Sequence, residues 1–67
     1  MPLHVITVRP LQLQPGDEIL GAGDTPTGVF VDEIWNDPEG PWLNTSDGDA
    51  GGVSPGTRFR VARVFDE

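Results

Sequence analysis

The stretch VFVDEIWND, residues 29–37, decides the fold class because it is one of the two longest segments without glycine or proline. The other is residues 57–67, and nine glycines and seven prolines interrupt the rest of the chain. An isolated helix needs about 12–15 residues to be marginally stable. Valine, isoleucine, phenylalanine and tryptophan, in which both segments are rich, favour β-strands. The sequence therefore predicts an all-β protein.

The same stretch also fits one competing interpretation, a short helix. Thr27 could cap such a helix at its N-terminus. Four apolar side chains have the spacing of one helix face: Phe30, Val31, Ile34 and Trp35. The helix remains an alternative to a strand in this segment.

Working outward from this stretch, five strands are separated by turn signals at close intervals. They are expected over residues 4–9, 17–22, 28–36, 42–46 and 57–64. Short strands at this spacing are typical of a small barrel or sandwich. We expect one domain over residues 1–67, whose core is formed by Ile6, Val8, Leu13, Ile19, Val29, Val31, Ile34, Leu43, Val53, Phe59 and Val61.

Two Pro-Gly pairs mark turns: QPGD at residues 14–17 and SPGT at residues 54–57. Proline fixes φ near −65° at the second position of a type II turn, and glycine supplies the positive φ of the third. Both are therefore predicted to be type II turns that lead into strands. Asp47-Gly48 is a further hairpin signal after the fourth strand.

The final strand has an irregular apolar pattern, because Phe59 and Val61 share one face while Val64 falls on the other. A β-bulge near Ala62 would return Val64 to the interior and turn Arg63 toward solvent. We therefore predict a bulge at that position.

Three segments, TVRPLQLQPGDEI near the start, SDG in the middle and VSPGTRFRV near the end, carry a resemblance. Together they resemble small SH3-like β-barrel proteins of actinobacteria and their phages. The resemblance implies a five-stranded antiparallel SH3-like barrel with a tight turn before its last strand. It brings no catalytic or binding residue with it.

Charge and composition narrow the classes of partner. Eleven acidic residues against four arginines give a net charge of −7, which repels nucleic-acid backbones and anionic membranes alike. The chain has no cysteine, no long apolar run and no basic segment leading into one. We expect a cytoplasmic protein, in the host cytoplasm if a phage encodes it, with no bound cofactor.

The residues able to do chemistry do not form a catalytic set. The doublets Asp17-Glu18 and Asp32-Glu33 are expected at the surface, because neighbours on a strand point to opposite faces. His4 is the only histidine. The loop from Asn44 to Asp49 carries oxygen ligands but lacks the spacing of a calcium loop. No catalytic or metal-binding residue is predicted, and the protein is expected not to be an enzyme.

The two tryptophans are the strongest candidates for a contact surface. Trp35 and Trp42 flank the loop NDPEGP, residues 36–41, whose prolines restrict its conformations. Tryptophan is enriched at binding hot spots. Trp35, Trp42, Asp37 and Glu39 are therefore predicted to bind a partner, although both tryptophans could instead belong to the core.

These observations favour a non-enzymatic protein-interaction module, such as a phage protein that docks on a host or virion protein. One alternative is an acidic mimic of nucleic acid that occupies the groove of a DNA-binding enzyme. Another is a small structural protein that assembles into a homo-oligomer, with Arg58 and Arg60 meeting the acids of another copy.

Overall fold

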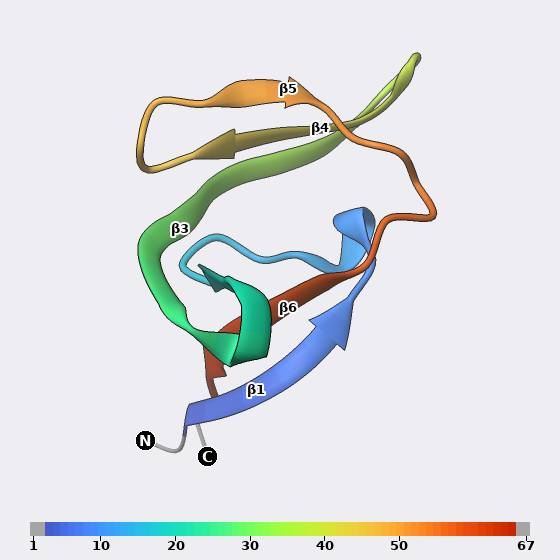
Figure 1. The fold of residues 1–67 in the computed structure, drawn as a ribbon. Coiled ribbons are helices and arrows are strands. Elements are labelled where there is room, and N and C mark those ends of the chain that lie inside the picture. Colours follow the sequence, from blue (N-terminus) through green and yellow to red (C-terminus); the bar gives the residue numbers. More distant parts are fainter. Residues whose placement is uncertain (1–2, 66–67) are drawn as a thin grey trace.

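The computed structural model describes residues 3–65, and Figure 1 shows the arrangement of their strands. The elements in chain order are β1 (Leu3–Val8), the 3₁₀ helix η1 (Pro10–Gln12), β2 (Glu18–Leu20), the 3₁₀ helix η2 (Ala22–Asp24), β3 (Pro26–Asp37), β4 (Gly40–Thr45), β5 (Ala50–Gly52) and β6 (Phe59–Val64). The predicted all-β class is confirmed.

All the strands join one antiparallel sheet in the order β1-β6-β2-β3-β4-β5. The long strand β3 curves between β2 below and the β4–β5 hairpin above, as Figure 1 shows. Within residues 3–65, β1 and β5 do not pair, so the sheet has two free edges and is not closed.

The expected five-stranded barrel is thus wrong in two respects. The sheet is open, and it contains a sixth strand, β5. The sequence of β5 is Ala-Gly-Gly, which has a low strand propensity and therefore gave no signal. Its pairing with β4 follows from the tight hairpin around Asp47-Gly48, in which Gly48 has a φ of 90°.

A β-bulge in β3 explains why this segment also fitted a helix. Val31 lies opposite Thr45 and Glu33 lies opposite Asn44. Between these two pairs β3 advances by two residues and β4 by one, so β3 contains one extra residue, which is a β-bulge. The extra residue changes the parity of the strand, and Val31 and Ile34 both face inward although they are three positions apart. The helix alternative is therefore wrong.

The core lies between the two halves of the curved sheet. Its buried side chains are Val8, Leu13, Val31, Leu43 and Val61, and the hydrophobic residues packed partly buried against them are Ile6, Ile19, Ile34, Val53 and Phe59. Val29, the last residue of the predicted core, is half-buried. The predicted core is confirmed for the other ten residues.

The final strand corrects a second prediction. β6 pairs with β1 in unbroken register from Leu3–Val64 to Val8–Phe59, so there is no bulge at Ala62. Val64 stays outside with 55% of its surface exposed, whereas Arg63 turns inward. The small side chain of Ala62, on the same face as Val64, is buried between its cross-strand neighbours Val5 of β1 and Glu18 of β2.

Each of the two Pro-Gly turns is closed by an equivalent backbone hydrogen bond, but the φ angles of their glycines differ. The amide of Asp17 donates to the Gln14 carbonyl at 3.1 Å, and that of Thr57 donates to the Ser54 carbonyl at 3.0 Å. Gly16 has a φ of +95°, as a type II turn requires, but Gly56 is not in the positive-φ region. The type II prediction is confirmed for the first turn and wrong for the second.

Alanine substitutions of the two glycines should have different effects on the stability of the protein. Gly16→Ala is expected to destabilise the protein by about 1–2 kcal/mol, because an L-residue at positive φ is strained although the space is free. Gly56→Ala, equally unobstructed, should range from neutral to about 1 kcal/mol more stable. Urea unfolding followed by circular dichroism measures both, and equal losses would contradict the assignment.

Candidate functional site

The two tryptophans form a cross-strand pair on the hairpin of β3 and β4. Trp35 lies opposite Trp42, and their rings stack with centroids 6.2 Å apart and planes 30° apart. The preceding pair, Ile34 and Leu43, faces the core, so the tryptophans point to the outer side of the sheet. Their exposed fractions are 40% and 36%.

Neighbouring groups fix the orientation of Trp42. Its indole Nε1 donates a hydrogen bond to Oδ1 of Asn44 at 3.1 Å. On the other side it lies opposite Gly52 of β5, and a Cβ atom at Gly52 would be 4.0 Å from the ring. The absence of a side chain at Gly52 leaves the edge of this ring open toward β5.

Carboxylates surround the tryptophan pair. Glu33 and Asp37 lie two residues before and after Trp35, on the same face of β3. Asp37 ends β3 and Glu39 lies in the turn that follows, where the Glu39 amide donates to Oδ1 of Asp37 at 3.1 Å. The surface of Glu33, Trp35, Asp37, Glu39, Trp42 and Asn44 is here called the tryptophan face. The structure thus brings all four predicted partner-binding residues together.

The charge around the tryptophan face has a single sign. Between Pro10 and Thr57 the sequence contains no arginine, lysine or histidine, whereas β3, β4 and their two turns contribute six acidic residues. The arginines lie in or beside β1 and β6 at the other end of the sheet. The tryptophan face therefore combines exposed aromatic rings with an uncompensated negative charge.

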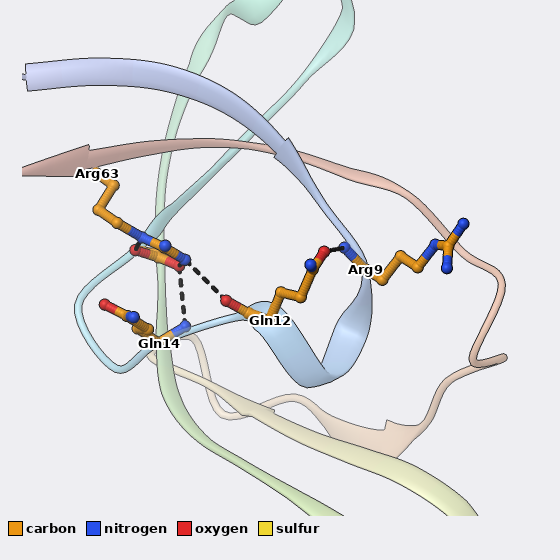
Figure 2. Close-up of polar contacts among 5 residues, drawn as sticks. Arg9, Gln12, Gln14 and Arg63 are labelled. Atoms are coloured by element: carbon orange, nitrogen blue, oxygen red, sulfur yellow. Dashed lines mark hydrogen bonds and ion pairs between the residues drawn. The ribbon is translucent and has the colours of Figure 1, made fainter.

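Asp17, expected at the surface, is instead buried with an exposed fraction of 2%. Both its oxygens accept hydrogen bonds from Arg63: Oδ1 from Nε at 2.8 Å and Oδ2 from Nη2 at 2.6 Å. The amide of Gln14 also donates to Oδ2, at 2.9 Å. Figure 2 shows Arg63 beside Gln14 and Gln12, whose carbonyl accepts from the same Nη2 at 2.9 Å.

This ion pair ties the first Pro-Gly turn to the last strand. The bidentate contact raises the pKa of Arg63, mainly through the hydrogen bonds that its guanidinium donates to Asp17. Every partner of the Asp17 carboxylate is a donor held in place by the fold, and a ligand has no access to it. We assign Asp17 and Arg63 a structural role.

A second bidentate pair joins Arg60 and Asp24 near the surface. Nε and Nη2 of Arg60 donate to the two carboxylate oxygens at 2.9 and 2.8 Å, and Nη1 donates to the Thr7 hydroxyl at 2.9 Å. The hydrogen bond from Arg60 lowers the pKa of Asp24. Arg60 is thus already engaged within its own chain.

The other candidate groups have local structural partners. His4 packs edge-on against Phe65 with ring centroids 4.9 Å apart. The Thr45 hydroxyl donates to Asp47, which lowers the pKa of that carboxyl and fixes the β4–β5 hairpin. Among residues 3–65, no three His, Asp or Glu side chains lie close enough to hold a metal ion. No helix in this range has the length and apolar character needed to cross a membrane.

Comparisons of the chain with protein-family models, curated proteins and solved structures gave no match. Glu33 and Asn44 were not predicted as part of the site, although alternation along each strand places them two residues from a tryptophan on the same face. Sequence reasoning also missed the open β5 edge next to Trp42, because that strand was not expected.

Proposed function

We propose that the protein is a non-enzymatic interaction module whose tryptophan face binds a positively charged segment of a partner protein. The observation that carries this proposal is the stacked, outward Trp35–Trp42 pair within a surface of carboxylates. Large exposed aromatic rings are typical of interface hot spots, and stacked tryptophans offer a rigid contact area.

The charge of the face determines the kind of partner. A guanidinium or ammonium group over an indole ring gains cation–π attraction, and nearby carboxylates can pair with the same group. Glu33, Asp37 and Glu39 provide those carboxylates on or beside the strand of Trp35. A partner rich in arginine or lysine therefore complements the face in both respects.

We also propose that strands β2 to β6 correspond to an SH3-like arrangement to which β1 is added. The tight turn at residues 54–57 before the last strand and the curved strand β3, shared by both halves, support this view. In this arrangement the tryptophan face lies on the outer side of the hairpin rather than in the core.

The self-assembly alternative depended on Arg58 and Arg60 as a basic face. Arg60 already pairs with Asp24 in the same chain, so it is less available to bind the acidic residues of another copy. The nucleic-acid mimic is distinguished by salt: it should lose affinity steeply as ionic strength rises, whereas an aromatic contact is less sensitive. Light scattering and binding at two salt concentrations separate these alternatives from the proposal.

Trp35→Ala tests the proposed function. The variant is expected to stay folded, because Trp35 is outward and partly exposed, and to lose its partner in affinity capture from the native host. Burying one such ring contributes on the order of 2 kcal/mol to an interface, or about thirtyfold in affinity. Thermal unfolding and quantitative mass spectrometry of the captured proteins measure the two effects.

Phe30→Ala is the matched control, because Phe30 is equally exposed at 41% but pairs with Glu18 in the other half of the sheet. It should retain the partner. The proposal is contradicted if Trp35→Ala captures the same proteins as the wild type, or if it unfolds and thereby shows that the ring supports the fold.

A further inference from the structure

The edge strand β5 presents unpaired backbone groups beside the tryptophan face. The amide of Val53 donates to the Pro41 carbonyl at 2.9 Å, and the amide of Thr45 donates to the Asp49 carbonyl at 2.9 Å. Hydrogen-bonded positions alternate along an antiparallel pair, so Gly51 faces β4 while Ala50 and Gly52 direct their N–H and C=O groups outward. Within residues 3–65 no backbone partner occupies those outward groups.

This edge lacks the devices that normally block strand addition. Proteins protect edge strands with lysines, prolines, bulges or covering segments. β5 consists of alanine and two glycines, pairs regularly with β4, and lies at the upper margin of the sheet in Figure 1. An extended chain can therefore approach its backbone without meeting a bulky side chain.

An apolar cleft of about 350 Å³ opens on the inner side of the same edge. Its walls include Ile19, Val29, Leu43 and Val53, and Gly51 forms part of its rim. Gly51 lies opposite Leu43 on the inner face, and a Cβ atom there would meet nothing within 4 Å. The missing side chain at Gly51 leaves room for an apolar side chain from outside.

We propose that β5 accepts an extended segment of the partner as a seventh strand, with alternating apolar and basic residues. This inference rests on the proposed function and adds the binding mode and the pattern of the ligand. A residue opposite Gly51 points inward and fills the cleft with a side chain such as valine. Its neighbours, opposite Ala50 and Gly52, point outward, where an arginine reaches the open edge of the Trp42 ring.

The negative charge of this edge favours a basic partner strand over a second copy of the chain. The edge is continuous with Asp47 and Asp49, which also line the cleft, and no basic residue lies between positions 10 and 57. Two copies joined through β5 would bring together surfaces of the same sign, which is unfavourable. A basic strand instead pairs with these carboxylates.

The test uses a seven-residue peptide that alternates arginine and valine, titrated into the ¹⁵N-labelled protein. Saturable shifts are expected at the amides of Ala50, Gly51 and Gly52, together with quenching of tryptophan fluorescence. A peptide of the same composition with its arginines grouped, and one N-methylated at alternate residues, should each bind about tenfold more weakly or worse. These controls remove the alternation and the strand hydrogen bonds, respectively.

Gly51→Leu is the decisive variant, because its side chain fills the cleft and leaves the tryptophan face intact. It should weaken the alternating peptide about tenfold or more. Gly56→Ala, a glycine variant in the distant turn, should bind like the wild type.

Three results would overturn the inference: no binding at millimolar peptide, equal binding of the N-methylated peptide, or an unaltered affinity of Gly51→Leu. If the amides of Trp35 and Trp42 shift while those of residues 50–52 do not, the seventh strand is refuted and the proposed function stands. If the β5 amides shift but Trp35→Ala retains the natural partner, the proposed function fails separately.

Discussion

Asp17→Ala is expected to leave the protein largely unfolded at room temperature. The substitution removes the buried carboxylate and leaves the largely buried Arg63 guanidinium with only the Gln12 carbonyl as acceptor; breaking a buried ion pair costs about 3–5 kcal/mol. A domain of this size rarely has more than about 3–5 kcal/mol of net stability. Far-ultraviolet circular dichroism and the dispersion of amide resonances measure the folded fraction.

Asp24→Ala is the matched control for this prediction. Asp24 also makes a bidentate pair with an arginine of β6, but 39% of its side chain and 46% of that of Arg60 are exposed. Solvent screens such pairs, so the variant should remain folded with only a small loss of stability. Similar unfolding curves for the two variants would show that burial does not determine the contribution of Asp17.

Leu13→Ala has the second largest expected effect. Leu13 follows η1 with only 3% of its surface exposed and belongs to the core cluster with Val31 and Leu43. Removing a buried leucine side chain costs about 2–5 kcal/mol, depending on how far the cavity collapses. The variant should show a greatly reduced urea midpoint or no folded baseline at 25 °C.

Leu11→Ala is the control, because it makes the same substitution at an exposed leucine. Leu11 lies two residues earlier, within η1, and 52% of its surface is exposed. Its truncation should alter the free energy of unfolding by less than about 0.5 kcal/mol. Equal losses at both leucines would mean that η1 does not seat Leu13 in the core as described.

The sequence predicted the features of the fold that follow from composition and simple alternation. Gly and Pro excluded long helices, and the alternation of apolar residues identified the inward side chains such as Val8 and Val61. The missing strand β5 and the bulge in β3 are different, because both depend on pairing with β4. Pairing with β4 makes Ala-Gly-Gly a strand despite its weak strand propensity, and local sequence patterns do not reveal such pairing.

The candidate site was predicted only in part. The outward position of Trp35 followed from its opposite parity to Ile34. The stacking of Trp42 on Trp35 was not predicted, because it depends on the register between β3 and β4. The burial of Asp17 could not be foreseen, because its partner Arg63 is 46 residues away in the chain. The regular register of β6 turns Arg63 inward, where the expected bulge would have turned it to solvent.

The position of β6 between β1 and β2 also bears on how the chain acquires its fold. The strand β6, the last of the six in chain order, joins β1 to the rest of the sheet, and the ends of β1 and β6 lie close together in Figure 1. Contacts between residues so distant in sequence slow folding, because the loop between them must close first. A chain that stops before Phe59 lacks the strand that links β1 to β2, so the complete sheet forms only once β6 is present.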